Sequence, residues 1–252
     1  MQQASLQDPQ HAFEEATYRK VAWRLMPLLL ACYVIAYLDR VNVGFAKLQM
    51  LEDLGFSEAV YGLGAGIFFI GYFFFEVPSN IILHKVGARV WIGRIMITWG
   101  LISSAMMFVD TPEMFYVMRF LLGVAEAGFF PGIILYLTYW YPSHRRGRMT
   151  AMFMTGIAGA GVIGGPLSGA IMKFADGAMG WSGWQWMFLL EGLPSVLLGV
   201  IVIVMLQDRI ADAKWLTAEE RDLLIRNIAA DGEHKEEESV FKVMSSGRVW
   251  LC

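Results

Sequence analysis

The chain has 252 residues, of which 56% are hydrophobic and 17% charged, with a formal net charge of -3 and a mean hydropathy of +0.49. Soluble domains usually carry about 25% charged residues, so this composition excludes an ordinary soluble domain. The acidic balance excludes a generally basic nucleic-acid binder. Two isolated cysteines, Cys32 and Cys252, form no metal-ligand or disulfide pattern.

Six apolar runs follow one another along the chain. A helix rises about 1.5 Å per residue, so about 20 apolar residues cross the hydrocarbon core of a bilayer. We therefore predict an all-α membrane protein in which a cytoplasmic tail at residues 1–21 precedes a six-helix bundle at 22–206. The predicted transmembrane helices are residues 22–46, 58–83, 90–110, 114–140, 147–174 and 185–206.

Basic residues are divided unevenly between the two ends of these helices. Most of the 20 Lys and Arg residues lie before the first helix, after the second and fourth helices, or after the sixth. Loops rich in Lys and Arg stay in the cytoplasm, so we expect both ends of the bundle to be cytoplasmic. The expected location is a bacterial inner membrane, with the lipid bilayer around the helices.

A charged segment follows the sixth helix, and residues 207–247 are expected to form a cytoplasmic linker. Thr217 precedes Glu220 by three residues, which is the spacing of a capping box at the start of a helix. A solvated linker with no function of its own is the simpler interpretation, because charge-rich runs are usually solvated. Hydrophobic residues return at 248–252, which predicts the start of a truncated seventh span and a longer natural protein.

Charged side chains inside the predicted helices are the informative residues: Asp39, Arg40, Glu76, Arg119 and Glu126. A charge at the centre of a bilayer costs at least about 2.5 kcal/mol, so such groups normally face a cavity or one another. Arg119 and Glu126 share one helical stripe. The helical rise places Arg119 at the same depth in the membrane as Asp39 and Arg40, and it places Glu126 about 10 Å deeper. An ion pair that only fixes helix packing is the alternative.

Helical phase gives Asp39 and Arg40 different surroundings, because adjacent residues are rotated by about 100°. Tyr33, Tyr37 and Arg40 lie on one stripe, where a guanidinium flanked by phenols can bind a carboxylate through two parallel hydrogen bonds. Alternatively, the two tyrosines only pack against neighbouring helices. Burial favours the neutral forms of Asp39 and Glu126, whereas nearby arginines favour their ionised forms, so each is a candidate proton carrier.

Three motifs resemble one family of transporters. They are Asp39-Arg40-Val41-Asn42, the run from Arg119 and Gly123 through Glu126-Ala127-Gly128 to Pro131, and Tyr139-Trp140-Tyr141-Pro142 with Arg145-Arg146-Gly147-Arg148. Together they resemble the anion:cation symporters of the major facilitator superfamily, which include sugar-acid permeases, vesicular glutamate transporters and sialin. Residues 71–80 are most similar to the tartrate, phthalate and hydroxyphenylacetate permeases.

This resemblance implies a fold and a mechanism. The six helices would form the amino-terminal bundle, made of two inverted three-helix repeats, and a carboxyl-terminal six-helix half would complete an alternating-access transporter. Arg40 would bind the substrate carboxylate, and Arg119 would couple the protonation of two carboxyl groups. The expected substrate-binding residues are Tyr33, Tyr37, Arg40 and Tyr72. The expected proton-coupling residues are Asp39, Arg119 and Glu126.

The loop after the second helix departs from the superfamily pattern Gly-x-x-x-Asp-Arg-x-Gly, because it lacks the aspartate. The expected gating residues here are His84, Lys85, Gly87 and Arg89. His84 either replaces the lost latch or is simply a basic residue on the cytoplasmic side. Glu76, where relatives commonly have glutamine, adds a titratable site or a hydrogen bond.

Proton-coupled uptake of a small organic anion is the leading hypothesis, with the anion and protons as partners. Gly165-Pro166 and the surrounding glycines resemble a motif of superfamily antiporters, so anion exchange is the second hypothesis. A non-transporting membrane scaffold or sensor is the third. No nucleophile–base pair, metal cluster or phosphate-binding loop supports an enzyme, and no cofactor, metal or nucleic acid is expected.

Overall fold

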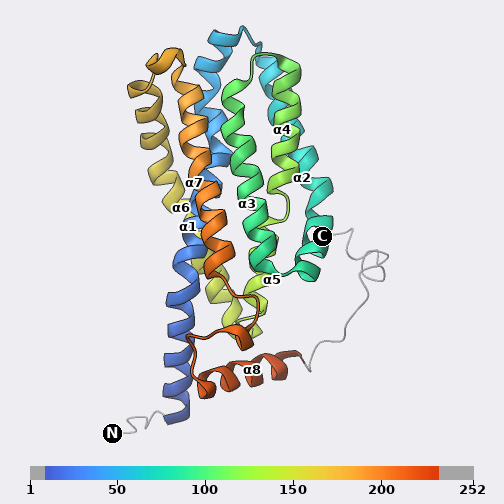
Figure 1. The fold of residues 1–252 in the computed structure, drawn as a ribbon, viewed down its shortest axis with the longest axis vertical. Helices are drawn as coiled ribbons and strands as arrows, with labels where there is room; N and C mark the ends of the chain where they lie inside the picture. The colour runs from blue at the N-terminus through green and yellow to red at the C-terminus, as the bar shows by residue number, and fades with distance from the viewer. Residues whose placement is uncertain (1–8, 233–252) are drawn as a thin grey trace, which may run out of the picture.

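The computed structural model describes residues 9–232, which form a bundle of long helices with one helix lying across its end (Figure 1). The predicted seventh span at 248–252 and the end of the predicted linker lie outside the described residues. Within residues 9–232, six helical spans are long and apolar enough to cross a membrane, which confirms the predicted fold class. The spans are α1 (Pro9–Leu54), α2 (Glu58–Val86), α3 with the 3-10 helix η1 (Ala88–Phe108), α4 with α5 (Pro112–Thr138), α6 (Ser143–Phe174) and α7 (Gly183–Met205).

The helices pack in pairs that are distant in sequence. In this bundle α3 lies along α7, α2 along α4, and α1 along both α6 and α7. Glycines permit the close approach of α3 and α7: a Cβ atom at Gly100 would lie 2.8 Å from the Gly192 carbonyl oxygen, and one at Gly93 would lie 2.8 Å from the Gly199 carbonyl oxygen. Small residues bring membrane helices together in this way.

The fourth span, predicted at residues 114–140, is present at Pro112–Thr138 but is divided into two helices. Helix α4 (Pro112–Glu126) ends where Gly128 adopts a left-handed conformation with a φ of 87°, and α5 (Phe129–Thr138) begins immediately after it. Pro131 has no amide hydrogen to continue the helix onto the Ala127 carbonyl. A side chain at residue 128 would also collide with Ser79, because its Cβ would lie 2.3 Å from the serine oxygen. The break leaves Glu126 at a helix end inside the bundle.

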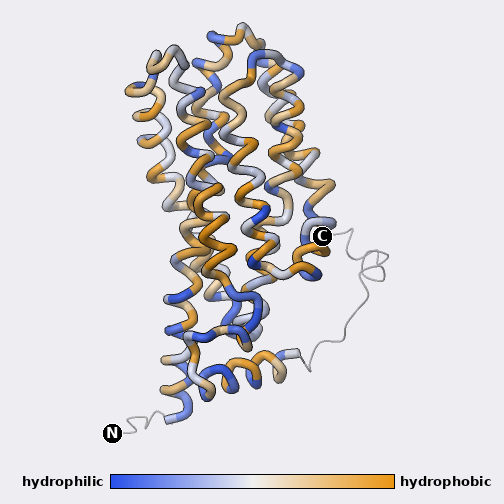
Figure 2. Tube along the Cα trace, in the orientation of Figure 1, coloured by the Kyte–Doolittle hydropathy of each residue, from blue (hydrophilic) through white to orange (hydrophobic). Residues whose placement is uncertain are grey.

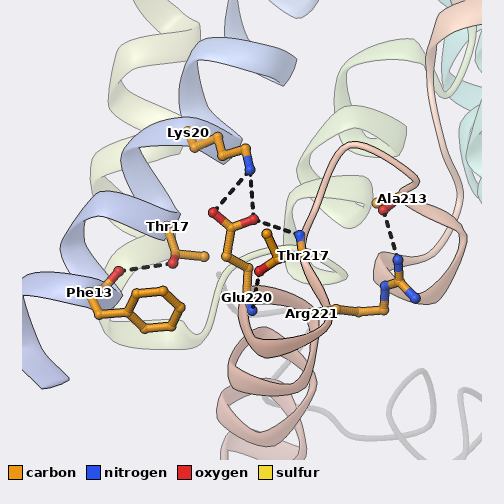
Figure 3. Close-up of polar contacts among 7 residues, drawn as sticks. All are labelled: Phe13, Thr17, Lys20, Ala213, Thr217, Glu220 and Arg221. Atoms are coloured by element: carbon orange, nitrogen blue, oxygen red, sulfur yellow. Dashed lines mark hydrogen bonds and ion pairs between the residues drawn. The ribbon is translucent and has the colours of Figure 1, made fainter.

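The predicted capping box is confirmed at the start of α8 (Ala218–Gly232). The Thr217 amide donates to the Glu220 carboxylate at 2.8 Å, and the Glu220 amide donates to the Thr217 hydroxyl at 3.2 Å. Figure 3 shows that the same carboxylate also receives two hydrogen bonds from Lys20 of α1, at 2.7 and 3.0 Å. Helix α8 is therefore tied to α1.

Several residues of the segment 207–232 pack against the bundle. Leu224 of α8 is fully buried, and the Trp215 ring stacks on Trp140 with 5.9 Å between ring centroids. The α1 helix also begins well before the predicted span and pairs there with the start of α6, since Arg145 binds Glu14 at 3.1 Å. Figure 2 shows hydrophilic residues concentrated at this end of the molecule.

Candidate functional site

A cavity of about 200 Å³ lies between α1, α2, α4 and α5. It contains all four residues expected to bind substrate, together with Glu126. Its lining consists of Tyr33, Ala36, Tyr37, Arg40, Tyr72, Glu126, Phe129 and Phe130. Tyr33 also packs, because its ring stacks on Phe153 with a centroid distance of 4.3 Å. The two interpretations of Tyr33 are therefore compatible.

Arg40 and Glu126 form an ion pair across this cavity. The Arg40 Nε atom donates to Glu126 Oε1 at 2.9 Å, and a terminal guanidinium nitrogen binds the same oxygen. The guanidinium carbon lies 5.1 Å from the centre of the Tyr72 ring. The expectation that Glu126 lies about 10 Å below Arg40 missed this contact, because the arginine side chain is long enough to span the difference in helical rise.

Asp39 is buried on another side of α1 and does not line the cavity. Its carboxylate receives three hydrogen bonds: from the Asn42 amide at 2.8 Å, from the Trp99 indole and from the Ser103 hydroxyl. The last two donors belong to α3. Asp39 and Arg40 therefore contact different helices, as adjacent residues of a helix must when both are inside a bundle.

Arg119 lies between α4 and α2 and is only 3% exposed. Its Nε atom donates to the Gly64 carbonyl at 3.4 Å, and its guanidinium carbon lies 4.7 Å from the centre of the Phe68 ring. It forms no ion pair with any described residue. The structure thus brings Arg119 into the same interior as Glu126 but does not join the two side chains directly.

His84 contacts Tyr139, the residue that follows α5. Its Nδ1 atom lies 2.8 Å from the Tyr139 hydroxyl oxygen. Burial and the nearby Asp208 charge raise the pKa of Tyr139 above its usual value of 10.0, so the phenol keeps its proton at neutral pH. Lys85, beside His84, is exposed. The expected gating loop therefore contains one residue in contact with a neighbouring helix and one directed to solvent.

An acidic residue that the sequence analysis did not single out holds the other end of this loop. Asp208 follows α7, and its carboxylate accepts a 2.7 Å hydrogen bond from the Arg89 amide at the start of α3. The Arg89 guanidinium lies 4.0 Å from the same carboxylate. Gly87 has a φ of 100°, and a Cβ atom there would lie 2.9 Å from Asp208. In the sequence, Asp208 is marked only by being the first acidic residue after the sixth predicted span.

The profile of the Major Facilitator Superfamily matches residues 29–251. The chain is 58% identical to a putative metabolite transport protein NicT of Pseudomonas putida, over 90% of this chain and 52% of that protein. It is 57% identical to a putative tartrate transporter of Agrobacterium vitis, over 86% of this chain and 48% of that protein. The chain thus spans about half the length of the curated relatives it matches, whose names are those of transporters and not of enzymes.

A solved structure has the same helical arrangement. It is the xylose transporter XylE from E. coli in a partially occluded inward-open conformation, with a TM-score of 0.65 and 13% sequence identity, covering 84% of this chain and 56% of that chain. At this identity the similarity concerns the fold alone.

Proposed function

Because this chain belongs to the Major Facilitator Superfamily, we propose that it forms the amino-terminal, substrate-binding half of a transporter that takes up a small organic carboxylate together with protons. The superfamily and the six apolar spans make it a multi-pass membrane protein. A second six-helix half would supply the opposite wall of the site. Both ends of the bundle would face the cytoplasm of a bacterial cell.

The observation that carries this proposal is the Arg40–Glu126 ion pair inside a cavity lined by tyrosines. A carboxylate is the natural partner of a guanidinium, and Glu126 occupies the position that a substrate carboxylate would take. Protonation of Glu126 would remove its charge and release the Arg40 donors. A substrate carboxylate then replaces Glu126 as the partner of Arg40, which links proton binding to anion binding.

The remaining charges support an anionic substrate. The cavity pairs the Arg40 guanidinium with one carboxyl group, that of Glu126, and Arg119 adds a buried guanidinium outside the cavity lining. With Glu126 protonated, this face of the bundle would carry an excess of positive charge in a medium of low dielectric, where charge interactions are strong. Asp39, held on the other side of α1, would exchange the second proton. Exchange of two anions remains the alternative mechanism, favoured by Pro166 within α6.

The test uses the full-length product of the gene, reconstituted in proteoliposomes, with labelled tartrate as the probe. Wild type and Glu126→Gln are compared for uptake driven by an inward proton gradient and for counterflow without a gradient. Gln has nearly the shape of protonated Glu but cannot release a proton. We expect the variant to lose gradient-driven accumulation and to keep counterflow. Glu113→Gln, at an exposed position of α4, is the matched control and should behave like wild type.

Other outcomes contradict parts of the proposal. Full gradient-driven accumulation by Glu126→Gln would exclude Glu126 as an obligatory proton carrier. Wild-type exchange that is independent of protons would favour the exchange mechanism. Failure of the wild type to take up tartrate or any other small carboxylate would contradict the substrate class.

A further inference from the structure

A second group of polar side chains is buried where α7 packs against α6 and against α3, away from the cavity. Glu191 of α7 is 4% exposed, and its Oε1 atom accepts a 2.6 Å hydrogen bond from the Ser168 hydroxyl of α6. Its Oε2 atom is buried without a hydrogen-bond partner among residues 9–232. The Ser195 hydroxyl, one turn further along α7, is likewise buried and unpartnered within this range. Glu191 has no role in the proposed substrate site.

Two serines of α3 connect this group to Asp39. A Cβ atom at Gly192 would lie 2.5 Å from the Ser104 hydroxyl oxygen, so Ser104 rests against α7 next to Glu191. Ser103, its neighbour, donates to Asp39. Ser103 and Ser104 are adjacent residues of α3, so Asp39 and Glu191 lie on either side of the same turn of this helix.

No cation balances Glu191 within the described part of the chain, where its carboxylate forms no ion pair with Lys, Arg or His. Asp39 of α1 lies across the Ser103–Ser104 turn, while α6 and α3 contribute the hydroxyls of Ser168 and Ser104. An ionised carboxylate deprived of water needs a cation or several donors. A single hydroxyl donor does not meet that need, and a second negative charge nearby makes ionisation still less favourable.

The two carboxyl groups have unequal sets of donors. Asp39 receives three hydrogen bonds, whereas Glu191 receives one and has a bare oxygen. Hydrogen bonds from donors stabilise the ionised form of a carboxyl group. A single proton shared by the two groups would therefore reside on Glu191, with the negative charge on Asp39.

We propose that Glu191 is a further proton-binding site beside Glu126 and Asp39, which holds one proton on Oε2 and shares it with Asp39 across the Ser103–Ser104 turn. When the proton leaves Glu191 and binds Asp39, the pair carries one negative charge before and after the transfer. The two buried carboxyl groups are therefore never ionised at the same time. Glu191 would thus keep a proton within the bundle while the Arg40–Glu126 site changes its partner. This inference extends the proposed function, but its test needs no transport.

The test is infrared spectroscopy of the full-length protein in lipid vesicles at neutral pH, where a protonated carboxyl group gives a C=O stretching band. We expect Glu191→Gln to lose one such band that wild type shows. Glu52→Gln, which alters an exposed carboxyl group at the end of α1, should keep it. Ser168→Ala should keep the band and shift it to higher frequency, because the carbonyl oxygen loses its hydrogen bond. A residue that merely packs would not produce this shift.

Two results would overturn the proposal. One is an unchanged set of acid bands in Glu191→Gln, which would mean that Glu191 is ionised in wild type. The other is an acid band that disappears when Na⁺ is added at constant pH, which would identify a cation site in place of a proton site. If Glu191→Gln does not fold, Ser168→Ala decides alone, and the absence of a shifted band then counts against the proposal. None of these results bears on the Glu126 experiment, so the two proposals fail separately.

Discussion

Arg40 binds Glu126 through two nitrogen atoms, Nε and a terminal nitrogen, and both bonds converge on one carboxylate oxygen. A lysine at this position keeps the charge but loses the planar fork that fixes the direction of both bonds. The identity of the residue therefore matters as well as its charge. The consequence can be measured as substrate affinity.

The first prediction concerns this difference between Arg and Lys. A hydrogen bond to a charged group contributes about 1.5–3 kcal/mol, so Arg40→Ala should weaken tartrate binding by about 100-fold. Arg40→Lys should recover only part of the loss, at about 10-fold weaker than wild type. Isothermal titration calorimetry of the purified full-length protein gives both values. Arg24→Ala, at an exposed position of α1, is the control, and unchanged affinity in Arg40→Ala would rule out the assigned role.

At the level of residues, the sequence predicts the direction in which a side chain points better than it predicts the residue that the side chain contacts. The different surroundings of Asp39 and Arg40 follow from helical phase, which is a local property of the chain. Their partners, Trp99 for one and Glu126 for the other, depend on how far apart the helices pack, and no local pattern contains that distance. Glu191 was overlooked because a single acidic residue in an otherwise apolar helix shows no pairing pattern in the sequence.

Helices are the scale at which the sequence is most informative, since the length of an apolar run directly reflects the thickness of the bilayer. The break after Glu126 was missed although Gly128 and Pro131 mark it, because both residues are also tolerated inside continuous membrane helices. The early start of α1 was missed for another reason. Its first residues are polar, and they are held by tertiary contacts such as Lys20–Glu220 instead of by the bilayer.

The second prediction concerns the attachment of α8 to α1, shown in Figure 3. Partial burial acts to raise the pKa of Glu220, but hydrogen bonds from Lys20 and the Thr217 amide outweigh burial and lower this pKa below its ordinary value of 4.5. A lowered folded-state pKa stabilises the docked helix fully above the ordinary value, and this stabilisation is lost as the pH falls through the folded-state value. Amide hydrogen exchange of residues 218–232 should therefore accelerate on acidification.

Lys20→Met provides the matched comparison for this experiment. At neutral pH it should already show the faster exchange of α8, and acidification should add little. Exchange rates must be corrected for the intrinsic pH dependence of amide exchange, which an exposed loop in the same protein supplies. Protection of α8 that is equal in both proteins at neutral pH would show that the Lys20–Glu220 pair does not hold the helix.

The whole molecule has one strongly polar end, where α8, the start of α1 and the start of α6 meet (Figure 2). Basic residues at this end include Lys20, Arg145 and Arg146. Because positively charged segments remain on the cytoplasmic side, this end should face the cytoplasm. The opposite end carries the α3–α4 connection and should face outward.

The third prediction tests this orientation by cysteine labelling in intact cells, in a Cys32→Ala and Cys252→Ser background. Glu113→Cys, in the first turn of α4, should react with a membrane-impermeant maleimide added outside. Lys214→Cys, in the exposed segment before α8, should react only after the cells are permeabilised. The reverse pattern of labelling would show that the bundle is inserted the other way round.

Helix α1 contains 46 residues, which at 1.5 Å per residue makes it about 69 Å long. This is more than twice the roughly 30 Å thickness of the hydrocarbon core, so much of the helix extends beyond the bilayer. Helix α1 thus carries both Lys20, which is hydrogen-bonded to Glu220 of α8, and Arg40, which lines the cavity. The contact with α8 and the cavity arginine therefore belong to one helix, in which Pro27 lies between them.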